Sequence, residues 1–134
     1  MRYKFLEHTA DVKFQSFGKS LEEAFENAAL ATFNIMYDGK VASKKKKKIK
    51  VKGKDLENLL YNFIEELLFL LDSENFFLSS VKVKIKDLKL VAELEGDNVK
   101  NYKPNIDVKA VTYNQMFVKK ISCRKFVCQV VLDV

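Results

Sequence analysis

The stretch FLEHTADVKF, residues 5–14, places an imidazole between carboxylates near the beginning of the chain. Glu7, His8 and Asp11 lie within five residues, and His8 is the one histidine in 134 residues. Carboxylate oxygens are ligands for hard cations, and a neighbouring imidazole can orient such a ligand through a hydrogen bond. The alternative is a half-buried histidine whose ring is satisfied by a backbone carbonyl, in what otherwise reads as an ordinary strand. Both interpretations stay open from these residues alone.

A second carboxylate lies at the far end of the chain. Alternating residues predict a strand over 126–134 that carries Asp133 on its more polar face, and a first strand over 11–17 with Asp11 on the corresponding face. If the two strands are neighbours, Asp11, Asp133 and the terminal carboxylate of Val134 would converge on one hard cation such as Ca²⁺ or Mg²⁺. Aspartates at strand ends are also common turn residues, which is the competing explanation.

The same alternation predicts the fold class. Ser20 and Glu23 form a capping-box pattern at the start of one helix, and Asp55 is a good N-cap for a second helix that runs to about Leu71. The broad apolar face of the second helix must be covered by a sheet or by a partner chain. Strands are predicted over 11–17, 49–51, 81–85, 88–94, 106–119 and 126–134. The sequence therefore predicts a single α+β domain over 1–134, with a mostly antiparallel β-sheet and two principal helices.

Composition limits the cellular setting. Residues 1–12 lack the apolar segment of a signal peptide, and the longest apolar run, 67–71, is too short to cross a bilayer. Cys123 and Cys128 lie five residues apart in a segment whose alternation reads as one strand, which would place them on opposite faces, so we expect two buried free thiols. A zinc site needs about four ligands, and only His8 could join the two cysteines. These features predict a soluble, cytoplasmic protein with no membrane partner.

The net charge of +6 comes from one lysine-rich segment. Its members are Lys44, Lys45, Lys46, Lys47, Lys48, Lys50, Lys52 and Lys54. The rest of the chain sums to −2, because these eight charges exceed the total of +6 by two. The segment either contacts RNA or an acidic partner, or is the solvated, charged edge strand that sheets use against aggregation.

Several motifs together resemble the archease family. The segment EHTADVKFQSFGKSLEEAF is similar to its N-terminal signature, a Glu-His-Thr-Ala-Asp stretch followed by a strand, a glycine and a capped helix. The similarity continues through DLENLLYNFIEELLFLLD, IDVKAVTYNQM and VVLDV, in the family's order and over nearly the whole chain. One position departs from the pattern: the family usually has histidine after the Thr-Tyr pair, where this chain has Asn114. Any role of that imidazole is therefore in doubt here.

The resemblance implies an accessory protein and not an enzyme. Archeases are partners of the GTP-dependent RNA ligase that joins tRNA halves after intron removal, so tRNA would be reached through the ligase. That ligase uses Mn²⁺, is guanylylated on an active-site histidine, and joins a 2′,3′-cyclic phosphate or 3′-phosphate end to a 5′-hydroxyl. Archease accelerates guanylylation and sustains multiple turnovers, and the same role is expected of this chain.

The resemblance also implies a Ca²⁺ site, with Mg²⁺ or Mn²⁺ as possible occupants in the cell. Family members bind the ion through the aspartate of the N-terminal signature and the acidic C-terminal end. In this chain those positions are Asp11, Asp133 and Val134, the last through main-chain or terminal oxygens. Glu7 and His8 would support Asp11. The implied ligand set coincides with the two strand ends whose more polar faces were identified by alternation.

Two other function classes stay open. The lysine segment, with Tyr102, Tyr113 and Phe117, could form a standalone RNA-binding module, although aromatic residues that alternate in strands are more often core. RNA binding that requires the ligase would favour the accessory role over this module. A metal-dependent hydrolase is disfavoured, because no general base beyond His8 and no nucleophile is evident.

Overall fold

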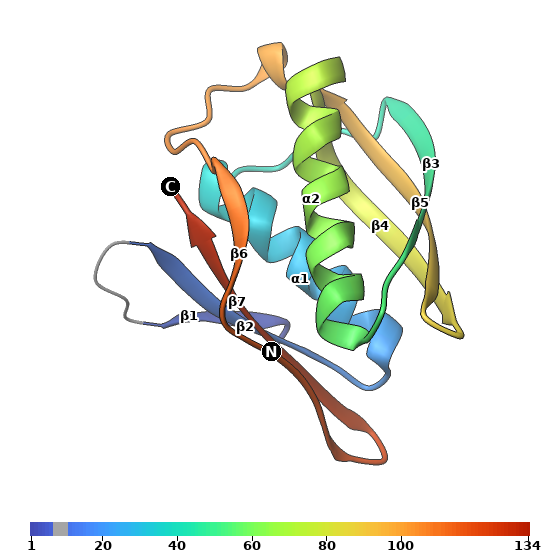
Figure 1. Ribbon diagram of the computed structural model, residues 1–134. Coiled ribbons are helices and arrows are strands. Elements are labelled where there is room, and N and C mark those ends of the chain that lie inside the picture. The colour runs from blue at the N-terminus through green and yellow to red at the C-terminus, as the bar shows by residue number, and fades with distance from the viewer. Residues whose placement is uncertain (7–10) are drawn as a thin grey trace.

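The structure, a computed structural model, describes residues 1–6 and 11–134 and consists of two antiparallel sheets with two long helices between them (Figure 1). One sheet has the order β1-β2-β7-β6 and the other the order β3-β5-β4. The strands are β1 (Tyr3–Leu6), β2 (Val12–Gly18), β3 (Lys45–Lys52), β4 (Phe76–Lys86), β5 (Lys89–Asn98), β6 (Ala110–Ser122) and β7 (Lys125–Asp133). The helices are α1 (Leu21–Met36), α2 (Leu56–Glu74) and the short 3-10 turn η1 (Val99–Asn101). The predicted α+β class is confirmed, with the strands divided between two sheets.

Local capping explains where the helices begin and end. The Ser20 hydroxyl accepts a hydrogen bond from Glu23 N, as the capping box predicts, but the Glu23 carboxylate accepts from Lys19 N and not from the cap residue itself. Asp55 accepts from Asn58 N at the start of α2. Asn75 ends α2 in the left-handed conformation, at a φ of 57°, which asparagine tolerates better than most residues.

The core lies between the sheets and contains both helices. α1 packs against β2 and β7 of one sheet and against β4 of the other, while α2 packs against β6 and against the three-stranded sheet. The rings of Phe25 and Phe63 stack where the two helices meet, with centroids 6.3 Å apart. The apolar face of α2 is therefore covered by elements of this chain. No helix among residues 1–6 and 11–134 has the length and apolarity needed to cross a bilayer.

Two strand predictions were wrong in their extent. The stretch 5–14 does not form one strand, since β1 ends at Leu6 and β2 begins at Val12 as its antiparallel partner. The strand predicted from residue 106 begins only at Ala110, after a loop that η1 introduces. Alternation in the sequence shows which residues of a strand share a face, but it does not show where the chain reverses.

The two cysteines have different environments, which corrects the prediction of two buried thiols. Cys123 is exposed in the turn between β6 and β7, because the chain reverses there and does not continue as one strand. Cys128 is fully buried in β7, and burial raises the pKa of its thiol to about 12. Both cysteines are free. Cys128 is therefore a protonated core side chain at neutral pH.

A buried carboxyl group fastens the loops beside β5. Asp97 is 3% exposed and accepts hydrogen bonds from Tyr102 Oη at 2.9 Å and Asn98 N at 2.8 Å, and Tyr102 Oη in turn accepts from Ala42 N. Burial acts to raise the pKa of Asp97, but these hydrogen bonds and the nearby Lys44 outweigh it and hold the pKa below its ordinary value. The ionised carboxylate is thus the form that the fold stabilises.

We expect Asp97→Asn to lower the melting temperature at pH 7 and to have a smaller effect in acid. The pKa is lower in the folded state than in the unfolded state, so the stabilisation is present above the unfolded pKa and is lost as pH falls through the folded value. The difference between the two proteins should therefore shrink below about pH 4. Thermal melts from pH 7 to pH 2.5 measure it, and a difference that stays constant over this range would contradict the assignment.

Candidate functional site

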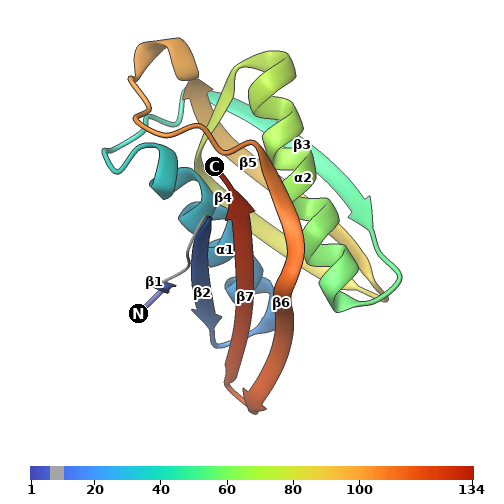
Figure 2. The same ribbon diagram turned by 60° about the vertical axis from the view of Figure 1, so that its left-hand side comes forward.

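The end of the central strand β7 brings the two predicted carboxylates to adjacent positions. Val12 of β2 pairs with Leu132 of β7, so the register, continued by one residue, sets Asp11 opposite Asp133. Opposite residues of an antiparallel pair project from the same face with Cβ atoms about 4.5–5.5 Å apart. The sequence argument required the first and last of its predicted strands to be neighbours, and β2 and β7 lie side by side (Figure 2).

Both carboxylates are accessible at this end of the sheet. Asp133 is exposed and Asp11 is half-buried. Within the part of the chain that the structure describes, neither carboxylate accepts a hydrogen bond or joins an ion pair. Val134 follows Asp133 and packs its side chain against the core, which fixes the main chain beside Asp133. Among the described residues, the two carboxylates thus have no partner that would compete with a cation or a partner protein.

The donor set has the chemistry of a hard-cation site. Two aspartates and the main-chain oxygens of Val134 offer oxygen ligands only, which suit Ca²⁺, Mg²⁺ or Mn²⁺ and not zinc. Among the described residues, no group of three or more histidine, cysteine, aspartate or glutamate side chains is placed to hold a metal ion. Glu7 and His8, the predicted supporting residues, lie outside the described residues. The ligand set and the identity of the metal stay predictions.

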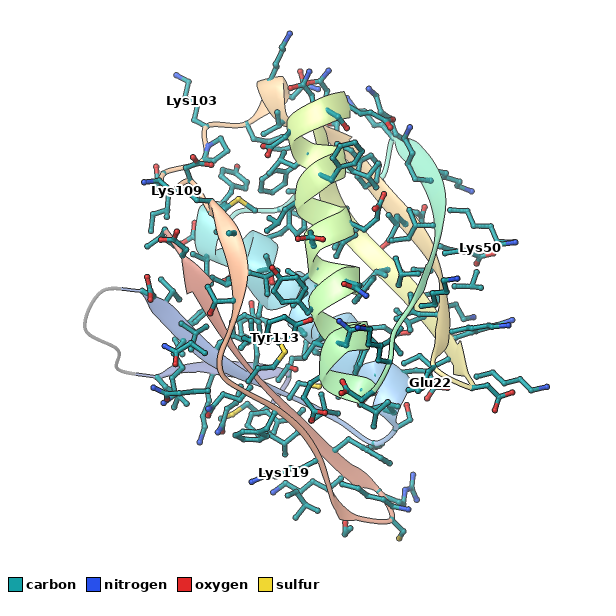
Figure 3. The ribbon with its side chains drawn as sticks, viewed as in Figure 1. Glu22, Lys50, Lys103, Lys109, Tyr113 and Lys119 are labelled. Atoms are coloured by element: carbon teal, nitrogen blue, oxygen red, sulfur yellow. The ribbon has the colours of Figure 1, made fainter. Side chains whose placement is uncertain are left out.

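The segment before β6 also reaches this end, and reasoning from sequence missed it. Lys109 N donates to Asp133 O at 2.8 Å, and Ala110 pairs with Asp133 in the register. Lys109 thus lies at the same end of the four-stranded sheet (Figure 3). The signal was present in the motif IDVKAV, but a strand predicted to start at residue 106 gave Lys109 no special position.

The lysines of the predicted segment do not all lie on one face of β3. Lys47 forms an ion pair with Glu74 at the end of α2, on the side of β3 that carries the buried Ile49. Lys46 and Lys48 project from the opposite face. Of the aromatic residues grouped with this segment, Tyr113 and Phe117 belong to β6 of the four-stranded sheet. Tyr102 lies close to the beginning of the segment, where its hydroxyl accepts a hydrogen bond from Ala42 N.

Asn114 stands where the resemblance leads us to expect histidine. It is exposed on β6 within the bulge between Thr112 and Phe117, and its N–H donates to Thr112 Oγ1 at 3.3 Å. The neighbouring Tyr113 stacks on Tyr61 of α2 with ring centroids 4.1 Å apart. Asn114 therefore occupies an exposed position on β6, and its amide side chain cannot replace a titrating imidazole.

Comparison with known proteins gives one consistent family. The model of the Archease protein family (MTH1598/TM1083) matches residues 3–134. The chain is 39% identical to the protein archease of Pyrococcus abyssi over 140 residues, covering 99% of each chain, and 42% identical to that of Sulfurisphaera tokodaii over 124 residues, covering 88% of each. The solution structure of Methanobacterium thermoautotrophicum protein 1598 superposes with a TM-score of 0.82 at 33% identity and 99% coverage of each chain.

Proposed function

Because the chain belongs to the archease family, we propose that it activates the GTP-dependent RNA ligase that joins tRNA halves. Archease proteins are generally known as activators of tRNA ligase. In this proposal the chain is an accessory protein that promotes ligase guanylylation and lets each ligase molecule complete many turnovers. The ligase brings it to tRNA.

The observation that supports this proposal is the register of β2 and β7, which, continued by one residue, sets Asp11 opposite Asp133 at an accessible sheet end. β7 is hydrogen-bonded on both sides, so the main chain that bears Asp133 is held rigidly. An exposed carboxylate on a rigid main chain, as at Asp133, is suited to contact a partner's active site, because little conformational entropy is lost on docking. Residues with these properties can act on another protein's metal ions, nucleotide or basic side chains.

The chemistry of guanylylation explains why carboxylates would help. Attack of the ligase histidine on GTP releases pyrophosphate, and the developing negative charge has to be neutralised by metal ions. Asp11 and Asp133 would bind a divalent cation, which we propose to be Ca²⁺, together with main-chain oxygens of Val134. When bound, such a cation supplies positive charge for phosphate oxygens. The two aspartates hold and orient it, and His8 would fix the orientation of Asp11.

A ligation assay tests the proposal directly. Ligase in limiting amount, excess tRNA halves and GTP are incubated with and without the protein, and joined product is counted per ligase molecule. We expect product to exceed one turnover only when the protein is present, and covalent guanylylation to accelerate in the absence of RNA. Equal yields in both reactions would exclude the activator role.

A further inference from the structure

The outer face of the three-stranded sheet carries a field of lysines that was not visible as one surface in the sequence. Residues at opposite register positions share a face, and the row Ile49–Ala92–Val83 is buried toward the helices. The alternate rows must then face outward. They are Lys46–Glu95–Ser80, Lys48–Glu93–Lys82, Lys50–Val91–Lys84 and Lys52–Lys89–Lys86. We call these twelve residues the lysine face.

The lysine face is strongly positive and has little of its charge neutralised. It holds eight exposed lysines against two glutamates, a net of six positive charges. Across the described residues, the only ion pair is that of Lys47 with Glu74, and Lys47 points to the other side of β3. Lys50 projects from β3 away from the helices (Figure 3). Repulsion among these like charges raises the free energy of the unbound protein. An anionic ligand would reduce that repulsion and would therefore be bound favourably.

The face continues into a second basic surface. A hollow of about 510 Å³ over Lys46, Lys48 and Lys82 also includes Ser80 and Val81. The same two residues line a cleft of about 580 Å³ beyond the β4 edge. Its basic residues are Arg2, Lys19, Arg124 and Lys125, which include both arginines of the chain. The two hollows thus adjoin each other at Ser80 and Val81 of β4.

The acidic residues of the cleft are engaged with main-chain groups. Glu23 accepts a hydrogen bond from Lys19 N, and Glu26 accepts one from Val83 N. Within the described part of the chain, neither Arg2 nor Arg124 forms an ion pair. Their guanidinium groups can each present a fork of donors to a phosphate. The cleft holds four basic side chains against two carboxylates, so it keeps a net positive charge and continues the basic surface.

We propose that the lysine face and this cleft bind the phosphate backbone of an RNA strand. Along each strand the lysines repeat at about 6.8 Å, because residues on one face are two apart, a spacing comparable to that of successive phosphates in an extended strand. The face contains no aromatic residue, so bases would not stack on it and binding would be independent of sequence. This assignment rests on the proposed function, because a protein that activates an RNA ligase works next to the RNA that the ligase joins.

The composition of the face favours RNA over an acidic protein. Protein interfaces have an apolar centre and are depleted in lysine, whereas nucleic-acid interfaces are polar and positively charged. Val91 is the one apolar residue among the twelve. The candidate site at Asp11 and Asp133 lies on the other sheet, so RNA and the ligase could be contacted at the same time.

The test is binding of a short unstructured RNA, measured by fluorescence anisotropy over a range of salt concentrations. The face variant carries Lys48→Gln, Lys50→Gln, Lys82→Gln and Lys84→Gln. Each lost phosphate contact should lower the slope of log Kobs against log salt by about 0.7, so we expect a decrease of about 2 to 3 and at least a roughly tenfold loss of affinity at low salt. A second variant, Arg2→Gln with Arg124→Gln, should lower the slope by about 1 and test the cleft.

The control variant removes the same charge from exposed lysines elsewhere. It carries Lys40→Gln, Lys100→Gln, Lys103→Gln and Lys119→Gln, and we expect it to bind RNA within about twofold of the wild type, because long-range charge effects are screened. An equal loss in the face and control variants would overturn the proposal, since binding would then follow net charge only. An unchanged slope in the arginine variant would remove the cleft from the RNA path.

Ligase guanylylation without RNA separates this inference from the proposed function. The face variant should stimulate guanylylation as the wild type does, because that reaction contains no RNA. If wild type stimulates guanylylation but does not bind RNA, the RNA path is wrong and the activator role stands. If the face variant loses stimulation without RNA, the face docks the ligase itself, and the RNA assignment is overturned. If the wild type binds RNA but does not stimulate guanylylation, the proposed function is wrong and the RNA assignment stands.

Discussion

Asp11→Ala is expected to abolish stimulation of the ligase, reducing multiple-turnover ligation to the level seen without the protein. Asp11 would contribute a ligand that no other described residue replaces. In the register of β2 and β7, continued by one residue, Asp11 is the one carboxylate opposite Asp133. Ligation and guanylylation assays measure the loss. Asp72→Ala, which removes an exposed carboxylate from α2, is the matched control and should leave stimulation unchanged. Full stimulation by the Asp11→Ala variant would show that Asp11 has no part in activation and is an ordinary residue at the end of a strand.

The same variant should reveal the cation in thermal melts. Without metal, two adjacent carboxylates repel each other, so Asp11→Ala is expected to melt at the same temperature as wild type or slightly higher. With saturating Ca²⁺ the wild type gains RT ln(1 + [L]/Kd) and the variant does not, so the order reverses. His8→Ala should keep part of the response, with Ca²⁺ affinity lowered about 10–100-fold. A larger loss in His8→Ala than in Asp11→Ala would exchange the roles assigned to the two residues.

Gly96→Ala is expected to destabilise the fold by about 3 kcal/mol or more, or to prevent folding. Gly96 is buried in β5 between β3 and β4, and a Cβ atom there would lie 2.2 Å from the carbonyl oxygen of Phe77. That oxygen belongs to the paired strand at a bulge, so it cannot move without separating β4 from β5. Urea unfolding monitored by circular dichroism measures the loss.

Gly39→Ala is the control for this substitution. Gly39 lies in an exposed loop, and the three atoms nearest to an added Cβ belong to the outer end of the Tyr37 ring. Because a ring tip can rotate away where a main-chain carbonyl cannot, we expect a loss below about 1 kcal/mol. Similar losses at both glycines would show that the close approach at Gly96 is relieved by movement of the strands.

Elements with a local cause could be predicted from sequence. Both helix starts depend on cap residues, Ser20 and Asp55, that bond within three residues of themselves. Alternation also placed Asp11 and Asp133 on the more polar faces of their strands, because alternation is a property of each strand alone. The lysine-rich strand was expected at a sheet edge, and β3 is an edge strand.

The rest depends on which strands pair, and alternation does not contain that information. Lys82 and Lys84 were assigned to an ordinary alternating strand, and only the register of β3-β5-β4 places them beside Lys48 and Lys50. The turn at Cys123 and the late start of β6 were missed for a related reason. Apolar residues alternate through both regions, and the reversal is set by long-range pairing.

The order β1-β2-β7-β6 also has a consequence for biosynthesis. β2 has to wait for β7, whose residues are made more than a hundred positions later: the side chains of Gln15 and Gln129 bond across a separation of 114 residues. Such non-local closure is slow and completes late in folding. On the ribosome, Asp11 has no Asp133 opposite it until the final strand has emerged and docked. If Asp11 and Asp133 act together as proposed, a chain whose β7 has not yet docked would not activate the ligase.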